Sequence, residues 1–295
     1  NGVLVHMGKS QSKNNSADIR QPPIFELANR LGNYSSRGNT MRLRNKTCVI
    51  TGATGAIGKA TAKLFHEHGA NLCLIGRDSE KLEDLKNEFE PMQDILIVQA
   101  EAKDEVAIRE AISRTYDQFG ALDAVFANGG TEGIIKPLTE YSQEEFNEIL
   151  HVNVTGVWLL MKYAVPLMQK NGGGSFVATS SGAGVVGFNG LCPYAASKHA
   201  VIGMMKTACL EFGSEKIRFN SLAPGPIDNR MMQSLHEQLN PDEPNSVREF
   251  VTESIPMRRY GSNQEIANLA LFLVSDESSF CNGAVFLSDG GFTAG

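Results

Sequence analysis

Short hydrophobic runs alternate with longer amphipathic segments along most of the chain, starting near Lys46. Most of the runs are bounded by Gly, Asn, Asp or Ser, a pattern typical of strands that are buried on both faces. The runs predict strands at Thr47–Thr51, Asn71–Ile75, Ile95–Gln99, Asp123–Ala127, Gly174–Thr179, Arg218–Ala223 and Ala284–Ser288. We therefore expect a sheet of about seven strands.

The segments between these runs carry helix signals. The predicted helices are Lys59–His68, Ser79–Glu90, Asp104–Phe119, a long helix from Ser142 to Met168, Tyr194–Phe212, and Ser262–Ser275. Ser142 with Glu145, and Ser262 with Glu265, have the spacing of capping boxes. Alternation of strands and helices predicts the α/β class: a single Rossmann-type, doubly wound parallel sheet with helices on both faces, formed by residues 46–295.

The first 45 residues lack this regular pattern. Residues 1–46 are rich in Asn, Ser and Gly, and hold eight Lys or Arg residues against two Asp or Glu residues. We interpret residues 1–45 as a basic, poorly ordered arm. Its origin stays open between an expression-tag remnant at His6-Met7, an organelle-targeting remnant, and an arm that packs on a neighbouring subunit.

Composition narrows the class of protein. The chain has 295 residues, 42% of them hydrophobic, which is enough for one sizeable core. A net charge of −6 argues against a nucleic-acid partner, and no hydrophobic run is long enough for a membrane span. Five cysteines without a CxxC pair predict free thiols in a reducing compartment, which favours the cytoplasm; the basic leader leaves an organelle open. No residues have metal-ligand spacing, so we expect no metal.

A glycine-rich turn, Thr51–Gly58, follows the first strand and opens the first helix. Glycine permits close approach of the backbone, and the free amides at the start of a helix attract phosphate groups. Glycine is common in purely structural turns, but the strand before it and the helix after it favour a dinucleotide site.

The second strand ends at Gly76-Arg77, which bears on the choice of cofactor. An acidic residue at this point would bind the ribose hydroxyls and repel a 2′-phosphate, whereas the guanidinium of Arg77 suits a phosphate. NADP(H) is therefore favoured and NAD(H) stays open. The alternative is that Arg77 is a solvated surface charge.

Tyr194 and Lys198 stand four positions apart, so on a helix they share one face. A phenol with a pKa of about 10 is a weak base at neutral pH, and a neighbouring ammonium can lower that pKa by roughly 1–3 units. Tyr194 could then serve as an acid or base, and the Ser181 hydroxyl could hold a substrate oxygen. The Tyr–Lys spacing alone is common on surface helices.

From about Lys46 onward the chain resembles the short-chain dehydrogenase/reductase family. The resemblance rests on the Thr51–Gly58 turn, Ala127-Asn128-Gly129-Gly130, Val152-Asn153-Val154, Ser181 with Tyr194 and Lys198, Pro224-Gly225-Pro226-Ile227, and Asp289-Gly290-Gly291-Phe292. Two departures affect the cofactor site. Ala56 stands where the family usually has the middle glycine, and Ala127 replaces the first asparagine of the family's Asn-Asn-Ala-Gly segment.

The resemblance implies a catalytic tetrad of Asn153, Ser181, Tyr194 and Lys198, in which the asparagine supports a water chain to the lysine; Ser180 is the less favoured serine. The predicted cofactor contacts are Gly52, Thr54, Gly55, Ala56, Ile57, Gly58, Arg77, Glu101, Ala102, Asn128, Gly129, Tyr194, Lys198, Pro224, Gly225, Ile227 and Asn229. Glu101 replaces the family's usual Asp near the adenine, and Asn229 replaces a usual Thr.

These residues predict an NADP(H)-preferring oxidoreductase that interconverts a secondary alcohol and a ketone. Residues 228–257 would cover the substrate, and Phe188, Leu191 and Cys192 would line the opposite wall. The methionines of this lid suit an apolar carbonyl compound of cyclic or medium-sized structure, although they could equally pack the lid onto the domain. The alternatives are a 3-oxoacyl-thioester reductase that docks its carrier at Arg258-Arg259, a related lyase or epimerase, and a catalytically silent NAD(P)-binding regulator or scaffold. The resemblance also implies a homodimer or homotetramer.

Overall fold

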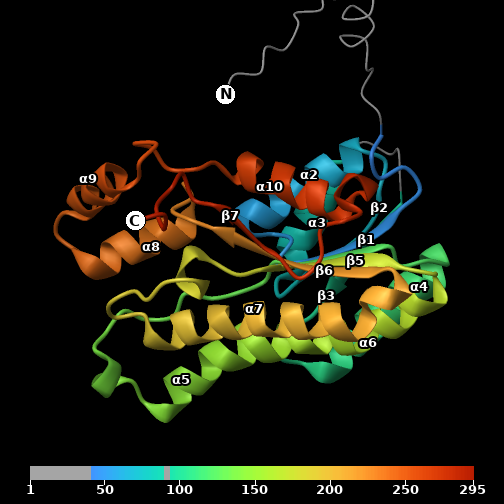
Figure 1. Ribbon diagram of the computed structural model, residues 1–295, viewed down its shortest axis with the longest axis horizontal. Coiled ribbons are helices and arrows are strands. Elements are labelled where there is room, and N and C mark those ends of the chain that lie inside the picture. Colours follow the sequence, from blue (N-terminus) through green and yellow to red (C-terminus); the bar gives the residue numbers. More distant parts are fainter. Residues whose placement is uncertain (1–40, 90–93) are drawn as a thin grey trace, which may run out of the picture. The chain divides into compact units, whose positions relative to one another are not determined.

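The computed structural model describes residues 41–89 and 94–295, which form a seven-stranded parallel sheet with helices on both faces (Figure 1). The strand order is β3-β2-β1-β4-β5-β6-β7. The strands are β1 Thr47–Thr51, β2 Asn71–Gly76, β3 Ile95–Gln99, β4 Ala124–Ala127, β5 Gly174–Thr179, β6 Ile217–Pro224 and β7 Val285–Ser288. The predicted fold class is confirmed. The order reverses direction between β1 and β4, where sheets of this kind bind ligands.

Helices α2, α3 and α10 cover one face of the sheet, and α4, α6 and α7 cover the other (Figure 1). The α-helices are α2 Ala56–Glu67, α3 Ser79–Asn87, α4 Glu105–Phe119, α5 Gln143–Leu150, α6 Gly156–Lys170, α7 Cys192–Phe212, α8 Arg230–Leu239, α9 Pro244–Ser254 and α10 Asn263–Val274. Glu90, the predicted end of the second helix, lies outside the described residues. Within the described ranges, no helix has the length and hydrophobicity needed to cross a membrane.

The sheet has a hydrophobic core on each face. Successive residues of a strand point to opposite faces, so Val49 of β1 packs with α4, α6 and α7, whereas its neighbours Cys48 and Ile50 pack with α2 and α10. All three side chains are fully buried. This double burial explains why β1 is a continuous hydrophobic run without a polar face.

The folded unit begins at Met41, earlier than Lys46, where the regular sequence pattern starts. Leu43 is 1% exposed, and its backbone N–H donates to the carbonyl of His68 at 3.0 Å. Arg42 forms an ion pair with Glu277. Residues 41–45 therefore pack on the domain although they were predicted to belong to the arm. Residues 1–40 of that arm lie outside the described residues.

The long helix predicted from Ser142 to Met168 contains a local irregularity. Its capping box is present: the Ser142 hydroxyl accepts from the Glu145 N–H at 3.2 Å, and the Glu145 carboxylate accepts from the Ser142 N–H at 2.8 Å. Between α5 and α6, however, residues His151–Thr155 form a π-helical segment. Such insertions often mark functional sites, and Asn153 lies inside this one.

Candidate active site

A cavity of about 1030 Å³ opens at the carboxyl ends of the strands. The turns after β1 to β6 contribute to its wall together with α8. Its lining includes Gly52, Thr54, Gly55, Ala56, Ile57, Arg77, Glu101, Ala102, Asn128, Gly129, Ser181, Tyr194, Lys198, Pro224, Gly225, Ile227 and Asn229. Two of the predicted site residues, Gly58 and Asn153, are buried behind this lining.

The glycine-rich turn brings two backbone segments close together. Gly52 has a φ of +61°, and a Cβ atom at this position would lie 2.8 Å from the Cα of Gly129. A Cβ at Gly58 would lie 2.1 Å from the carbonyl oxygen of Gly52, so Gly58 lets α2 pack under the turn. The N-cap residue Gly55 offers no side-chain cap, which leaves the first amides of α2 available to an anion. The exposed position of Ala56 accommodates its methyl group.

A hydroxyl group that the sequence analysis did not single out holds the segment after β4. Thr51 Oγ1 accepts from the N–H groups of Asn128 at 3.1 Å and Gly129 at 3.2 Å. Asn128 Oδ1 in turn accepts from Thr179 Oγ1 at 3.2 Å. These bonds tie the ends of β1, β4 and β5 together, so the segment is anchored even though Ala127 replaces the family's first asparagine.

The predicted pair on α7 is buried at the cavity wall. Tyr194 is 9% exposed and Lys198 is 4% exposed. The Lys198 ammonium nitrogen lies 5.6 Å from the centre of the Tyr194 ring and donates to the carbonyl of Thr179 at 2.8 Å. Helical spacing thus places both side chains on one face, as expected.

The two adjacent serines have different surroundings. Ser180 is 1% exposed, and its hydroxyl donates to the backbone carbonyl of Lys198 at 2.9 Å. Ser181 lines the cavity, its hydroxyl accepts from the Ala183 N–H at 3.1 Å, and its presence lowers the pKa of Tyr194. The geometry therefore favours Ser181 as the serine that meets a substrate.

The Asn153 side chain forms two hydrogen bonds to the backbone of Thr131. Its Oδ1 accepts from the Thr131 N–H at 2.9 Å, while its Nδ2 donates to the Thr131 carbonyl at 2.9 Å and to Ser197 Oγ at 3.0 Å. A Cβ at Gly130 would lie 3.2 Å from Asn153 Oδ1 and 3.4 Å from Lys198 Nζ. The π-helical segment thus positions Asn153 to hold the Gly130–Thr131 backbone beside Lys198.

Burial dominates the electrostatics of the site. It raises the pKa of Tyr194, an effect that the hydrogen bond with Ser181 opposes and the negative charge of Glu132 reinforces. Burial also lowers the pKa of Lys198 to about 8. The expected lowering of the Tyr194 pKa is therefore wrong in direction, because burial of the phenol outweighs the lowering effects. The Lys198 ammonium donates to the Thr179 carbonyl. In this arrangement Tyr194 keeps its proton at neutral pH and can donate it.

The predicted lid contains two helices, α8 and α9 (Figure 1). Met231, Met232 and Leu235 of α8 line the cavity, as do Phe188 and Leu191 on the opposite wall; Cys192 is not among the lining residues of the described chain.

Tyr260, just beyond the lid, contacts both of its helices: His236 of α8 hydrogen-bonds to Tyr260 Oη at 2.8 Å, and the Arg248 guanidinium of α9 lies 4.5 Å from the centre of the Tyr260 ring. Within the lid, Arg248 forms a bidentate pair with Asp228 at 2.9 and 2.8 Å. Burial lowers the pKa of His236, which favours its neutral form in the pair with Tyr260. The lid is therefore a packed element of the domain.

Comparison with known proteins agrees with this geometry. Residues 52–293 match a family described as enoyl-(acyl carrier protein) reductase. Levodione reductase of Leifsonia aquatica is 34% identical over 258 residues, covering 86% of this chain and 97% of that protein. The 3-oxoacyl-(acyl-carrier-protein) reductase FabG of Thermotoga maritima is 36% identical over 255 residues, which cover 85% of this chain and 99% of that protein. The chain belongs to the short-chain dehydrogenase/reductase family.

Solved structures of this family superpose well on the described fold. The crystal structure of levodione reductase has a TM-score of 0.84 at 34% identity and covers 85% of this chain and 99% of its own. The crystal structure of NAD⁺-bound xylitol dehydrogenase has a TM-score of 0.81 at 31% identity, and the match covers 84% of this chain and 99% of that chain. This short-chain dehydrogenase/reductase is accordingly an NAD(P)-dependent oxidoreductase that acts on CH–OH groups.

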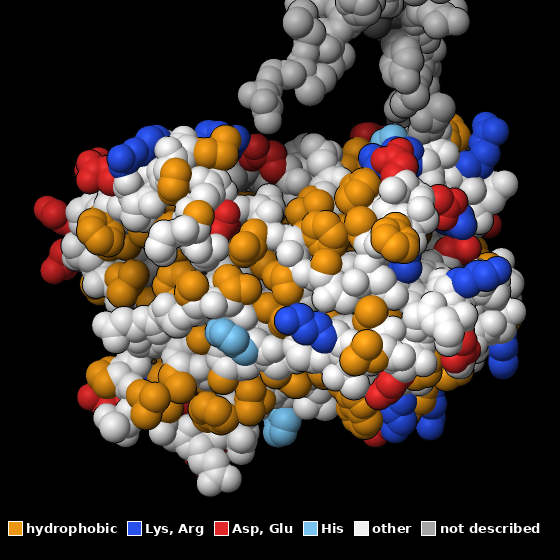
Figure 2. Space-filling view, in the orientation of Figure 1, with side chains coloured by type: hydrophobic (Ala, Val, Ile, Leu, Met, Phe, Trp, Pro, Cys, Tyr) orange, Lys and Arg blue, Asp and Glu red, His pale blue; other side chains and the backbone are white. Residues whose placement is uncertain are grey.

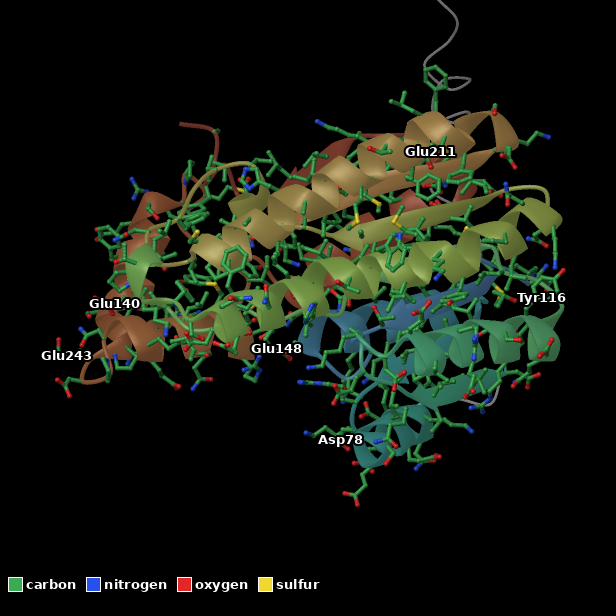
Figure 3. The ribbon with its side chains drawn as sticks, turned by 90° about the horizontal axis from the view of Figure 1, so that it is seen from below. Asp78, Tyr116, Glu140, Glu148, Glu211 and Glu243 are labelled. Carbon is green, nitrogen blue, oxygen red and sulfur yellow. The ribbon has the colours of Figure 1, made fainter. Side chains whose placement is uncertain are left out.

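The end of the cavity that follows β2 and β3 carries several cationic groups in this dehydrogenase. The exposed Arg77, Lys81 and Lys103 line it together with Asp78 and Glu101. Asp78, labelled in Figure 3, caps α3 by accepting from the Lys81 N–H at 3.1 Å, and pairs with Lys81 Nζ at 3.0 Å. The backbone hydrogen bond from Lys81 lowers the pKa of Asp78. The carboxylate of Asp78 is therefore engaged with α3.

Asn229 has a structural task in this dehydrogenase. Its Oδ1 caps α8 by accepting from the N–H groups of Met231 at 3.0 Å and Met232 at 3.4 Å. Its Nδ2 donates to Asn263 Oδ1 at 3.3 Å. Although Asn229 lines the cavity, its side chain is already paired within the protein, so the polar group that replaces the family's Thr fixes the start of the lid.

The cysteines form no disulfide and all five are free. Burial raises the pKa of Cys73 to about 12 and raises the pKa of Cys48 further still, so both are inert packing groups. Among residues 41–89 and 94–295, no three His, Cys, Asp or Glu side chains are placed to hold a metal ion.

Proposed function

We propose that this short-chain dehydrogenase/reductase interconverts a secondary alcohol and a ketone with NADP(H), and that Tyr194 transfers the proton. The observation that carries the proposal is the burial of Tyr194 at the cavity wall, which Ser181 also lines. A phenol held in its protonated form by burial is suited to protonate a carbonyl oxygen. The arrangement therefore favours ketone reduction at neutral pH.

The other residues of the constellation assist Tyr194. The Ser181 hydroxyl holds the substrate oxygen next to the phenol. Lys198, with a pKa of about 8, exchanges protons near neutral pH and places positive charge 5.6 Å from the phenol ring. Asn153 acts as a positioning residue, because it fixes the Gly130–Thr131 backbone that borders Lys198.

The cofactor residues fit a dinucleotide. Gly52 and Gly129 lack side chains, so the turn is open to close approach by a dinucleotide. The uncapped amides at the start of α2 suit its pyrophosphate. When bound, the nicotinamide supplies or accepts the hydride. The segment Pro224–Ile227 lies at the cavity end of β6, where its backbone would meet the carboxamide.

The proposed preference for NADP(H) rests on Arg77 and Asp78, the two residues that follow β2. The guanidinium of Arg77 is exposed at the cavity rim, whereas the neighbouring carboxylate of Asp78 is paired with Lys81. A 2′-phosphate would thus meet the Arg77 guanidinium beside an Asp78 carboxylate whose charge Lys81 already compensates. The solved relative xylitol dehydrogenase is NAD⁺-bound, so both cofactors belong in the test.

The test is a substrate screen of the purified protein with cyclic and acyclic ketones and alcohols, using NADPH and NADH in parallel. The proposal expects turnover of at least one ketone, with kcat/KM higher for NADPH. Tight NADPH binding without turnover of any ketone or alcohol would instead indicate a cofactor-binding regulator or scaffold.

A 3-oxoacyl-thioester reductase is the second candidate, favoured by the identity to the 3-oxoacyl-(acyl-carrier-protein) reductase of Thermotoga maritima. A carrier would dock on basic residues, and Arg258 and Arg259 lie near the lid. However, Arg259 is paired with Glu265 at 2.6 Å, and Arg258 donates to the carbonyl of Glu253. This pairing weakens the basic patch. Including a 3-oxoacyl thioester in the screen separates the two candidates.

We further propose that the protein forms a homodimer or homotetramer. Leu210 of α7 is 87% exposed and Phe280 is 103% exposed, and Trp158 of α6 is also exposed. Figure 2 shows hydrophobic side chains on the side of the molecule where α7, α8 and α9 lie. Surfaces of this kind are typical of subunit contacts. Light scattering that detects only the monomer would contradict the proposal.

A further inference from the structure

A buried carboxylate lies in the cavity near Tyr194. The Glu132 side chain is 7% exposed and belongs to the cavity lining. Its negative charge raises the pKa of Tyr194, which places it within electrostatic reach of that phenol. Burying a carboxylate costs free energy unless donors compensate it, so a buried Glu needs hydrogen-bond partners.

The backbone around Glu132 is held on both sides. On one side, Asn153 binds both the N–H and the carbonyl of Thr131 at 2.9 Å. On the other side, Gln238 of α8 accepts from the Ile135 N–H at 2.9 Å and donates to the carbonyl of Gly133 at 3.4 Å. The carboxylate is thus fixed between Asn153, which positions the reaction centre, and the lid.

The partner of Glu132 in the structure is a weak one. Arg230, the first residue of α8, approaches through Nη2 at 3.3 and 3.5 Å, and its side chain is 75% exposed. These are long hydrogen bonds to a solvated cation, and such pairs contribute little. A carboxylate has about four acceptor sites, so this contact leaves Glu132 able to accept from a ligand.

The other acidic residues of the cavity lie in different parts of the wall. Asp78 and Glu101 follow β2 and β3, at the adenosine end, and Glu148 of α5 is paired with Lys103 at 2.7 Å. The wall provided by α8 is mostly apolar, with Met231, Met232, Leu235 and Leu239. Its polar members already have partners: Arg230 pairs with Glu132, and His236 hydrogen-bonds to Tyr260. Glu132 therefore gives an apolar substrate pocket one strong hydrogen-bond acceptor.

We propose that Glu132 accepts a hydrogen bond from a second hydroxyl group of the substrate, so that the enzyme acts on diols, polyols and hydroxyketones. This inference rests on the proposed alcohol–ketone function. A neutral hydroxyl fits better than an ammonium group, because Arg230 beside the carboxylate repels a second cation. The Glu132 carboxylate would also discriminate against substrates without a second hydroxyl group, because such substrates leave the buried carboxylate without a hydrogen-bond donor.

The test compares cyclohexanol with 1,2-cyclohexanediol, which share a ring and differ in one hydroxyl group. Steady-state oxidation with NADP⁺ and NAD⁺ is measured for the wild type, Glu132→Gln and Glu132→Leu. The control is Glu140→Gln, an exposed acidic residue outside the cavity lining (Figure 3). In Glu132→Leu, loss of a hydrogen bond to a charged group should lower kcat/KM for the diol by about 10- to 100-fold. The loss should be smaller in Glu132→Gln. In both variants it should arise mainly from a higher KM.

Circular dichroism checks the folding of each variant, and kcat/KM for cyclohexanol, measured at the optimal pH of each variant, should not fall. A second readout is the pH profile of alcohol oxidation. Because the charge of Glu132 raises the pKa of Tyr194, Glu132→Gln should extend oxidation to lower pH. Equal losses for both alcohols, or no loss for the diol, would overturn this inference alone. A wild type that oxidises neither alcohol and reduces no ketone would overturn the proposed function as well.

Discussion

The ammonium of Lys198 is held against the Thr179 carbonyl at 2.8 Å and lies 5.6 Å from the centre of the Tyr194 ring. This hydrogen bond fixes the cation behind the phenol, at the end of β5. Both side chains are buried, which raises the pKa of Tyr194 and lowers that of Lys198 to about 8. At neutral pH the phenol therefore keeps its proton, while Lys198 is still largely protonated and places a buried positive charge beside it.

This relationship predicts a stability gain when the lysine is replaced. In the folded state Lys198 has a pKa of about 8, below its ordinary 10.5, so between these values the unfolded chain binds more protons. Folding stability of the wild type therefore rises as pH increases from about 8 to 10.5. Lys198→Met, which removes the buried charge, should raise stability at pH 7 by about 1–2 kcal/mol while abolishing turnover.

The measurement is thermal unfolding of both proteins across this pH range. The difference in Tm between variant and wild type should shrink as pH rises, because the wild-type lysine then becomes neutral. A difference in Tm that is independent of pH would show that burial does not perturb Lys198.

A glycine beside the reaction centre gives a second prediction. A Cβ at Gly130 would lie 3.2 Å from Asn153 Oδ1 and 3.4 Å from Lys198 Nζ, so Gly130→Ala should displace both groups and lower kcat by about 10-fold or more. The matched control is Gly203→Ala in α7, where an added Cβ meets nothing within 4 Å. That variant should keep full activity and gain about 0.5–1 kcal/mol of stability. Equal kcat values for the two variants would contradict the proposed role of the Gly130 segment.

The choice of cofactor is tested at Arg77. Arg77→Ala should raise KM for NADPH by about 10- to 100-fold, because a charge-assisted bond to the 2′-phosphate is lost. KM for NADH should change little, since that cofactor lacks the phosphate. Steady-state kinetics with each cofactor at a fixed ketone concentration measures both values. If Arg77 is only a solvated surface charge, the two KM values will change by the same factor.

Much of the sheet could be predicted from the sequence. The strands Ile95–Gln99 and Gly174–Thr179 were predicted with their observed bounds, because buried parallel strands are continuous hydrophobic runs that end at turn residues. The glycine-rich turn was also recognisable, because a steric requirement fixes the residue type: at Gly52 and Gly58 any side chain would collide with the backbone.

Other features left no periodic signal. The π-helical segment His151–Thr155 changes hydrogen bonding within a helix without changing the pattern of hydrophobic residues. Glu132 lies in a loop, where a charged residue is ordinarily exposed, yet it is buried, and tertiary contacts of this kind leave no mark on the local sequence. The pKa of Tyr194 was predicted from its spacing to Lys198 alone, whereas burial, which spacing does not report, sets its direction.

The central claim is that Tyr194 transfers the proton, and Tyr194→Phe tests it most directly. Removing one hydroxyl should lower kcat/KM for ketone reduction by at least about 1000-fold, while NADPH binding, followed by nicotinamide fluorescence, changes by less than about 3-fold. Tyr116→Phe, at the end of the domain opposite Glu140 and Glu243 (Figure 3), is the control and should keep wild-type turnover. Retention of turnover by Tyr194→Phe would contradict the mechanism.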